Sequence, residues 1–332
     1  MRLHSDSDRR RGLWQEWGMS IDDPTRVFTP ADLDYPPVVP VAPQRRVCPV
    51  NGLELSYLVW GDEAKPPIVL VHGGKDHGRM WDWTVAELIN EWCVIVPDLR
   101  GHGDSGRASG GGYEGEYFIS DFAGFMAHLE REGFTLPMPL IGHSLGGNIV
   151  LNYAAIYPDK VTRLIALEGL GASEKHYTEF MEKSPADRYR SWIDRRLKQD
   201  AIDQRRFDGP EEMVSRMAGV HKNLEEGQAR HLALHAARKY SDGWGWKHDP
   251  LTGIWPSPRM TAPAEYSRVY AEITCPVLLM RGEDSWASDP QNDGRMKAFK
   301  NARLINYDKA GHWLHHDRFD AFIGDVKTFL AE

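Results

Sequence analysis

The stretch that decides the fold is LIGHSLGGNIVLNYA, residues 140–154. The apolar residues before Gly142 are typical of a short buried strand, and from Leu145 onward apolar residues recur at helical spacing. Ser144 therefore lies in the turn that joins a strand to a helix. Glycine at 142 and 146 completes G-x-S-x-G, because a turn this sharp excludes bulky neighbours. The pattern predicts a serine hydroxyl at the end of a sheet, beside a helix N-terminus that favours negative charge.

The composition indicates a globular protein. Its 332 residues are 41% hydrophobic and 27% charged, which suits one large core or a core with an inserted segment. A net charge of −8 argues against a nucleic-acid or anionic-membrane partner, and no run approaches the roughly 18 apolar residues of a membrane span. The N-terminus lacks the apolar stretch of a secretory signal. Because Cys48, Cys93 and Cys275 are odd in number and fall in or beside strand-like runs, we expect buried free thiols and a cytoplasmic location.

Residues 1–45 are predicted to be an N-terminal extension. They begin with charged residues and continue with TPADLDYPPVVPVAP, whose prolines disfavour the interior of a helix or sheet. Trp14, Trp17 and Phe28 indicate that this arm packs on a surface. Packing on a second subunit would make the protein a homodimer, and we keep that as a hypothesis.

Strands and helices alternate after the extension. Asn51-Gly52 predicts a hairpin between the first two strands. Later apolar runs of four to six residues alternate with amphipathic helices, which predicts a mostly parallel sheet covered on both faces. The expected strands lie within 45–50, 52–61, 66–74, 93–101, 139–141, 161–171, 275–285 and 302–313, with helices at 79–90 and 117–132.

The alternation stops near residue 171 and resumes near 265. Between them, charged helical segments and a tryptophan-rich loop predict a helical cap over 171–264, with no convincing strand. The core is then formed by 46–170 and 265–332, so the cap is inserted between two halves of one sheet.

A nucleophilic serine needs a base, and His312 is the best candidate. INYDKAGHWLHHD places it in the loop after the last strand, at the same end of the sheet as Ser144. His315 and His316 fall at the start of the next helix, where we expect them to face solvent or to support the site indirectly. His72-Gly73-Gly74 follows an early strand, and Gly74 is predicted to aim its N–H at the reacting oxygen together with that of Leu145. Such donors each lower the barrier by about 3–4 kcal/mol.

These motifs resemble those of the α/β-hydrolase family. H-G-G after a strand, PDLRGHGDS at 97–105, G-H-S-L-G-G at 142–147 and A-G-H-W at 310–313 occur in the family's order. The resemblance covers about residues 45–332, except for much of the cap. It implies a doubly wound, eight-stranded α/β sheet with a helical cap inserted after the sixth strand.

The catalytic acid has two candidates. Most of the family carries it as G-x-x-D after the seventh strand, but here the segment is Gly282-Glu283-Asp284-Ser285, with the aspartate one residue early. A one-residue shift at a strand end turns a side chain to the other face. Some relatives, including certain esterases and zearalenone lactonases, carry the acid after the sixth strand, 24 residues beyond the nucleophile, which corresponds to Glu168. We favour Glu168, with Asp284 as the alternative and Asp289 as a weaker one.

Several residues near these motifs are candidates for a substrate pocket. The "GWGWKHDP" loop could either stack on a substrate or anchor the cap. His102 could line the pocket or hold its turn, whereas Asp98 and Arg100 are expected to be structural. No metal or cofactor is expected, because a site built from His72, His77 and GHGD would lack a compact ligand set. The pocket candidates are His72, Gly73, Lys75, His143, Trp246 and Trp313.

The sequence therefore predicts a serine hydrolase that cleaves a small carboxylic ester or lactone through an acyl-enzyme intermediate. Epoxide hydrolases and haloalkane dehalogenases of this fold use an aspartate nucleophile, and position 144 is serine. Two alternatives stay open. One is hydrolysis of a C–C bond in a vinylogous ketone, and the other is a receptor of the same fold without catalytic activity.

Overall fold

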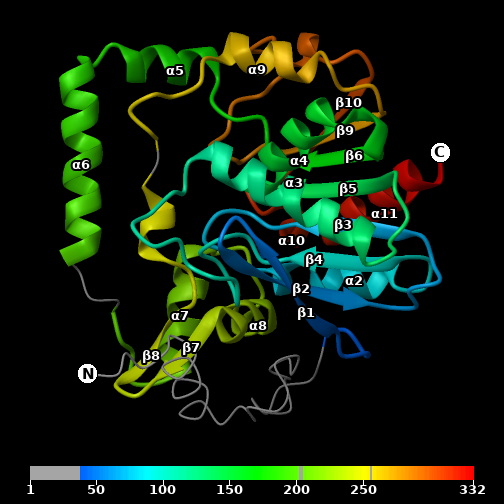
Figure 1. Ribbon diagram of the computed structural model, residues 1–332, viewed down its shortest axis with the longest axis horizontal. Helices are drawn as coiled ribbons and strands as arrows, with labels where there is room; N and C mark the ends of the chain where they lie inside the picture. Colours follow the sequence, from blue (N-terminus) through cyan, green and yellow to red (C-terminus); the bar gives the residue numbers. More distant parts are fainter. Residues whose placement is uncertain (1–37, 202–204, 255) are drawn as a thin grey trace, which may run out of the picture.

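The computed structural model describes residues 38–201, 205–254 and 256–332. Eight strands form one sheet in the order β1-β2-β4-β3-β5-β6-β9-β10 (Figure 1). The pairs β1–β2 and β2–β4 are antiparallel, and all other neighbours in this sheet are parallel. The predicted eight-stranded, mostly parallel sheet is confirmed. Its strands are β1 (Gln44–Val50), β2 (Leu53–Trp60), β3 (Pro67–Val71), β4 (Cys93–Pro97), β5 (Met138–His143), β6 (Val161–Leu167), β9 (Val277–Gly282) and β10 (Ala302–Tyr307).

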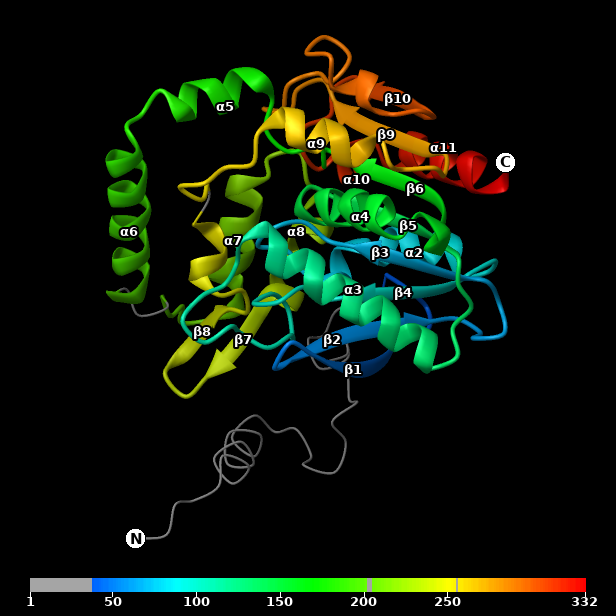
Figure 2. The same cartoon turned by 45° about the horizontal axis from the view of Figure 1, so that its top comes forward.

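Helices cover both faces of this sheet (Figures 1 and 2). One face carries α3 (Gly115–Arg131), α4 (Leu145–Ile156) and α9 (Pro263–Tyr270), and the other carries α2 (Asp82–Leu88), α10 (Leu314–Asp317) and α11 (Phe319–Ala331). Each helix buries an apolar stripe, as helical spacing predicts. In α3 the stripe is Phe118, Phe122, Phe125 and Leu129. Short 3-10 helices are η2 (Gly78–Trp81), η3 (Pro158–Lys160) and η5 (Arg295–Ala298).

The β1–β2 turn has the geometry that Asn-Gly predicts. Asn51 and Gly52 both have positive φ, 48° and 75°, and Val50 pairs with Leu53 across the turn. Two consecutive residues with positive φ match the twist of the flanking strands. The three cysteines are free and buried, as expected.

The segment between β6 and α9 forms a cap beside the end of the sheet where Ser144 follows β5 (Figure 2). Its helices are α5 (Glu174–Met181), α6 (Pro185–Ala201), α7 (Pro210–Val220), α8 (Glu226–Ala236) and η4 (Pro250–Gly253). The cap also contains an antiparallel hairpin of β7 (Ala237–Tyr240) and β8 (Gly243–Trp246). The expectation of no strand here was wrong. Both strands have four residues, and Gly243 and Gly245 in GWGW interrupt the alternation that signals a strand.

Specific contacts join the cap to the core. Nε2 of His77 donates to the carbonyl of Leu232 at 3.0 Å, and the N–H of Asp249 donates to the carbonyl of Gly101 at 2.7 Å. Tyr113 also donates its hydroxyl to the Asp249 carboxylate at 2.8 Å. These bonds fix one wall of the cap to the loops that follow β3 and β4.

Most of the predicted extension, residues 1–37, lies outside the described residues, and so do Trp14, Trp17 and Phe28. Within the described ranges, no helix is both long and apolar enough to cross a membrane.

Candidate active site

Ser144 occupies a strained turn between β5 and α4. Its φ and ψ are 52° and −114°, a combination that is costly for a residue with a side chain. The backbone N–H of Ser144 donates to the carbonyl of Leu167 at 2.7 Å, and this hydrogen bond holds the turn in place. A Cβ at Gly142 would collide with the carbonyl of Gly146, and one at Gly146 would collide with the carbonyl of Val71. Both glycines of the motif are therefore required by close backbone packing.

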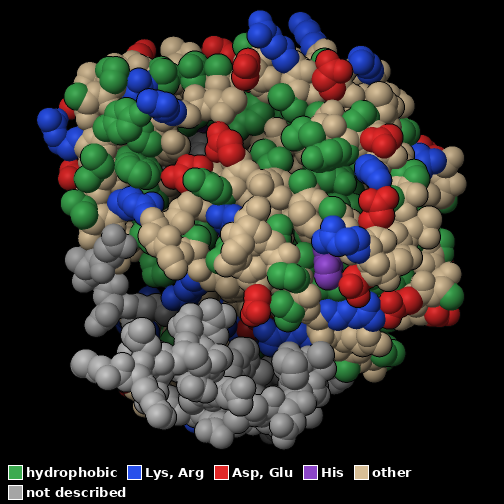
Figure 3. Space-filling view, in the orientation of Figure 1, with side chains coloured by type: hydrophobic (Ala, Val, Ile, Leu, Met, Phe, Trp, Pro, Cys, Tyr) green, Lys and Arg blue, Asp and Glu red, His purple; other side chains and the backbone are tan. Residues whose placement is uncertain are grey.

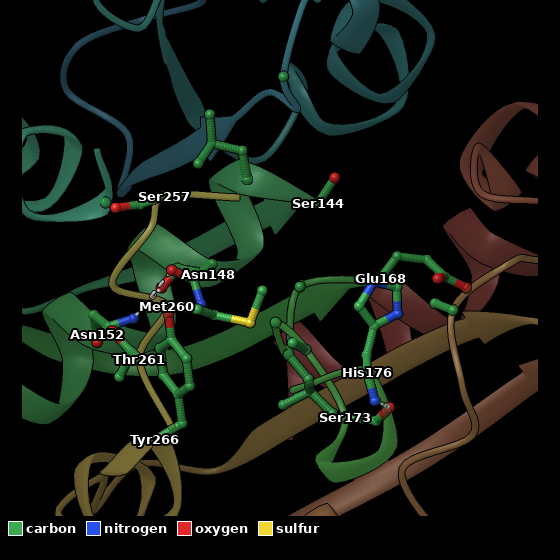
Figure 4. A pocket seen from close by; sticks show the side chains of 18 of the residues that line it. Ser144, Asn148, Asn152, Glu168, Ser173, His176, Ser257, Met260, Thr261 and Tyr266 are labelled. Carbon is green, nitrogen blue, oxygen red and sulfur yellow. Dashed lines mark hydrogen bonds between the residues drawn. The ribbon is translucent and has the colours of Figure 1, made fainter. Parts of the chain in front are cut away.

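Ser144 lies in the wall of a large cavity between core and cap (Figure 4). The cavity has a volume of about 780 Å³, within the range of small-molecule sites. Gly74, Leu145 and Glu168 line it together with the serine, and the cap contributes Trp192 among others. Four of the predicted catalytic and oxyanion residues therefore share one cavity.

Glu168 follows β6 and is held by two donors from the loop after β9. Its side chain is fully buried, and its φ of 54° is again unusual for a residue with a side chain. The N–H of Gly282 donates to Oε1 at 2.8 Å, and the hydroxyl of Ser285 donates to Oε2 at 2.9 Å. Oε2 also lies 3.5 Å from Nδ1 of His312. This separation is longer than a normal hydrogen bond, but catalytic hydrogen bonds often tighten only when substrate binds.

The structure places the alternative acids differently. Asp284 is exposed, and its backbone N–H donates to the carbonyl of Ala310. Asp289 accepts from the N–H of Gln291 and the amide of Asn292, so it organises its own loop. Of the three carboxylates considered from sequence, Glu168 is the one with an oxygen within 4 Å of a His312 ring nitrogen, at 3.5 Å.

His312 lies between the core and the loop after β9. Its ring is 21% exposed, and the rings of His143 and Trp286 pack on it with centroids 4.9 and 5.0 Å away. Nε2 of His143 donates to the His312 carbonyl at 2.9 Å. Burial, followed by the charge of His312, lowers the pKa of His143 well below its ordinary value. The neutral His143 ring therefore supports the backbone of His312.

One of our two expectations was that His315 and His316 face solvent. The structure contradicts it. Both are buried in α10, and burial lowers the pKa of His316 to about 3 and that of His315 well below its ordinary value. The ring of His315 packs against Trp81 at 5.1 Å and against His143 at 4.7 Å. His315 thus supports His143 from behind.

The two predicted oxyanion donors flank the serine. Gly74 lies in the loop after β3. A Cβ added to Gly74 would meet no atom within 4 Å, so the space beside its backbone is open. Leu145 is the first residue of α4, where an N–H has no partner within the helix. Both residues line the same cavity as Ser144.

Six residues expected to line the pocket lie outside the cavity lining: His72, Gly73, Lys75, His143, Trp246 and Trp313. His72 is fully buried, accepting from the N–H of Leu99 at Nε2 and donating from Nδ1 to Gly73. Trp313 stacks on His221 of the cap with ring centroids 3.6 Å apart, and Trp246 packs on Phe207 within the cap.

These residues have structural roles outside the cavity. His72 forms hydrogen bonds with buried backbone groups, and Trp246 and Trp313 pack on side chains of the cap. Gly73 permits a close approach, because a Cβ there would lie 2.8 Å from Nδ1 of His143. His102 is also buried and bonds the carbonyl of Arg100, so it holds its turn.

Sequence reasoning missed a polar wall of the cavity. It consists of Asn148 and Asn152 on α4 with Thr261 and Tyr266 at the start of α9, and Figure 4 shows these four together. The signal was present: the two asparagines stand four and eight residues after Ser144 in an otherwise apolar helix, which places them on the same helix face.

The described residues best placed to hold a metal lie outside this cavity. Asp82, His231 and His235 each offer a donor atom, all within 4.8 Å of one another. Arg79 already binds both oxygens of the Asp82 carboxylate, at 2.9 Å and 2.5 Å. Burial alone would raise the pKa of Asp82, but Arg79 and His231 outweigh it and hold the pKa below its ordinary value. The carboxylate is therefore already paired with a cation, and the cluster ties α8 to α2.

Comparison with known proteins identifies the family of this fold. A family model described as the alpha/beta hydrolase fold matches residues 66–319. The chain belongs to this family. The α/β hydrolase is 26% identical over 205 residues to a serine hydrolase-like protein of Danio rerio, covering 60% of each protein. It is 27% identical over 302 residues to epoxide hydrolase 4 of Mus musculus, covering 85% of this chain and 77% of that protein.

Solved structures share the fold of this α/β hydrolase. The thioesterase domain from the curacin biosynthetic pathway superposes with a TM-score of 0.72 at 21% identity, covering 86% of this chain and all of that domain. The relatives are named for hydrolysis of different chemical bonds. Membership of the family therefore establishes a hydrolase fold, and the substrate has to be inferred from the residues of the site.

Proposed function

We propose that this protein is a serine hydrolase that cleaves a carboxylic ester or lactone. Ser144 is the nucleophile, His312 the general base and Glu168 the acid that orients the imidazole. The observation that supports this most is the approach of a Glu168 carboxylate oxygen to within 3.5 Å of Nδ1 of His312, while Glu168 and Ser144 line the same cavity. Epoxide hydrolysis in this fold uses an aspartate nucleophile, so the serine at 144 favours acyl transfer despite the similarity to epoxide hydrolase 4.

The proposed reaction has two steps. The hydroxyl oxygen of Ser144 bonds to the substrate carbonyl carbon while His312 takes the proton. The N–H groups of Gly74 and Leu145 hold the oxygen that becomes negative. The C–O bond to the alcohol then breaks, and His312 returns the proton to the leaving oxygen. Water repeats the sequence on the acyl-enzyme and releases the carboxylic acid and Ser144.

The buried carboxylate has a defined task in this scheme. Glu168 stabilises the imidazolium that forms when His312 takes the proton. Two donors, the N–H of Gly282 and the hydroxyl of Ser285, bind the two oxygens of the buried Glu168 carboxylate where solvent is absent. These hydrogen bonds compensate for burying a polar group at the end of an apolar strand.

A fluorophosphonate probe tests the proposal directly. Stoichiometric labelling of Ser144, located by mass spectrometry and lost in Ser144→Ala, is the expected result. A panel of p-nitrophenyl esters and lactones should then be hydrolysed with release of the acid. An unlabelled Ser144 in folded protein would favour the inactive receptor. Labelling without ester or lactone turnover would favour the C–C bond hydrolase, whose substrates should then be cleaved.

A further inference from the structure

We propose that Trp286 binds the alcohol part of the substrate and that this part carries an aromatic ring without a positive charge. The proposal rests on the proposed function and adds the chemical class of the leaving group. It also assigns a specificity-determining residue in the loop after β9, where the sequence motifs did not single one out.

Trp286 is unusually exposed for a tryptophan. It is 74% exposed, although tryptophan is on average one of the more buried residue types. Leaving an indole in water is unfavourable, and aromatic side chains are typical of the walls of ligand sites. Trp286 also lines the cavity that Ser144 lines. Its ring is therefore available to contact a ligand in this cavity.

The backbone around Trp286 is held by three hydrogen bonds. The N–H of Ser285 donates to the carbonyl of Gly282 at 3.2 Å, and the N–H of Ala287 donates to the hydroxyl oxygen of Ser285 at 3.2 Å. Nε of Arg281 donates to the carbonyl of Ala287, also at 3.2 Å. Because the same Ser285 hydroxyl donates to the proposed catalytic acid, one loop positions both the acid and the indole.

Trp286 is in contact with both the cavity and the proposed general base. Its ring centroid lies 5.0 Å from that of His312, and the two ring planes are inclined by 36°. The ring of His143 also packs on His312, at 4.9 Å. His143 is buried and lies outside the cavity lining, whereas Trp286 belongs to the lining. Of these two rings, Trp286 is thus the one that a substrate beside His312 can meet.

The contact with His312 indicates which part of the substrate lies near Trp286. In the proposed reaction His312 gives its proton to the oxygen of the departing alcohol. This oxygen must therefore come within hydrogen-bond distance of the His312 ring, about 2.6–3.2 Å. The acyl carbon is instead bonded to Ser144. A group attached to the alcohol oxygen is accordingly expected beside the indole.

An aromatic ring uses the indole surface better than a saturated ring of similar size. Offset or edge-to-face pairs of aromatic rings are more stable than their buried area alone predicts, by the equivalent of about fivefold in affinity. The surroundings also suit a ring, because β9 and the loop after it contribute apolar residues to the cavity wall. These residues are Leu279, Met280, Ala287 and Pro290.

A positive charge on this group is disfavoured, although an indole can also bind cations. Arg281 lines the cavity and binds the carbonyl of the residue after Trp286. Its guanidinium forms no ion pair with any residue in the described ranges, so its positive charge would repel a cationic alcohol. On the face shown in Figure 3, acidic and basic side chains are interspersed, so that face does not attract cations in particular.

Two matched pairs of esters test the inference. On the alcohol side, benzyl acetate is compared with cyclohexylmethyl acetate, in which a saturated ring replaces the aromatic ring. On the acyl side, methyl phenylacetate is compared with methyl cyclohexylacetate. The measured quantity is the ratio of kcat/KM within each pair, determined for the wild type and for Trp286→Leu. We expect the alcohol ratio to be about fivefold higher in the wild type and the acyl ratio to be equal in both proteins.

Two further variants assign the effect to the indole. Trp286→Phe keeps an aromatic ring and should retain most of the alcohol preference. Trp92→Leu is the same exchange at a half-buried position before β4, outside the cavity lining, and should keep the wild-type ratio. Comparing ratios cancels the intrinsic reactivity of each ester. If Trp286→Leu slows both esters of the alcohol pair equally, Trp286 acts through His312 alone and the inference is wrong.

Two other results would overturn the inference. A change confined to the acyl pair would place the indole on the other side of the scissile bond. A wild-type preference for acetylcholine over its neutral carbon isostere, lost in Trp286→Leu, would show that the indole binds a cation.

A binding measurement decides if Trp286→Leu does not fold or the esters are not hydrolysed. Benzyl alcohol and cyclohexylmethanol are then compared as inhibitors of fluorophosphonate labelling of the wild type. Stronger inhibition by benzyl alcohol supports the inference, and equal inhibition contradicts it. Labelled protein without any aromatic preference rejects this inference and leaves the serine hydrolase standing. Absence of labelling would instead reject the proposed function.

Discussion

The hydroxyl of Ser285 lies 2.9 Å from Oε2 of Glu168 and donates a hydrogen bond to it, although the two residues are 117 positions apart. Glu168 follows β6 and Ser285 follows β9, and these strands are parallel neighbours in the sheet. The loop in which most of the α/β-hydrolase family carries its acid here supplies two donors, Ser285 and the N–H of Gly282. The Glu168 carboxylate comes from the end of the adjacent strand, and the end of β9 together with the loop after it holds this carboxylate in place.

Replacing Ser144 should abolish hydrolysis without unfolding the protein. Ser144→Ala removes the proposed nucleophile, and such losses are of the order of 10⁴–10⁶-fold in turnover. The measurement is kcat on a p-nitrophenyl ester, with thermal unfolding as the check on folding. A folded variant that keeps a tenth or more of the activity would show that another residue attacks.

Replacing His312 should reduce turnover to a similar residual rate, because nucleophile and base act as a unit and their effects do not add. The matched control is His315→Leu. Neither ring nitrogen of His315 has a hydrogen-bond partner among the described residues, so an apolar side chain of similar size should be tolerated. We expect less than a tenfold loss in the control, and an inactive His315→Leu beside an active His312→Ala would reverse the assignment.

Replacing Glu168 distinguishes between the two candidate acids. Glu168→Gln keeps the size of the side chain but cannot stabilise an imidazolium, so kcat should fall by about 10⁴. Asp284→Asn changes an exposed group and should cost less than tenfold. Steady-state kinetics of both variants on the same ester give the comparison, and a larger loss for Asp284→Asn would exclude Glu168 as the acid.

Ser285 is expected to be a positioning residue. Ser285→Ala removes one donor from Glu168 and should lower kcat by roughly tenfold, the effect of one hydrogen bond to a charged group. Ser285 does not line the cavity, so KM should stay near its wild-type value. Ser285→Thr keeps the hydroxyl and should keep kcat near that of the wild type. A variant Ser285→Ala in which KM rises while kcat is unchanged would contradict the positioning role.

Acid should destabilise the protein because buried histidines must stay neutral. Burial lowers the pKa of His72 and of His102 from 6.5 to about 3. Between these values the unfolded chain binds more protons than the folded chain, so the free energy of unfolding decreases as the pH falls. Each histidine contributes about 1.4 kcal/mol per pH unit in this range. Urea unfolding at several pH values from about 7.5 down to about 4 measures the slope.

A variant can assign part of this slope. His102 donates from Nδ1 to the carbonyl of Arg100 at 2.7 Å, and His102→Asn keeps a donor near that atom without a titrating group. The free energy of unfolding of this variant should depend less steeply on pH than that of the wild type. The difference in slope should correspond to about one proton fewer taken up on unfolding. Equal slopes would mean that His102 does not contribute.

Local sequence was sufficient for the fold and for the position of Ser144. Strand and helix periodicity depend on neighbouring residues, so the eight-stranded sheet could be read from the chain. The glycines at 142 and 146 are also local signals, because only a residue without a side chain permits the backbone approach found there. The short strands β7 and β8 were not predicted, because four residues carry too weak a pattern and two of the four in β8 are glycine.

The tertiary structure decided which groups meet. Spacing alone left Glu168 and Asp284 open, because a positive φ at the end of β6 and the turn after β9 set where each carboxylate points. It also showed that His72, His315 and His316 are buried and that Asn148 lines the cavity, since burial depends on segments far apart in the chain. Sequence thus determined the elements and the nucleophile turn through local backbone constraints. Side-chain partners across the sheet were set by long-range packing, which no local pattern encodes.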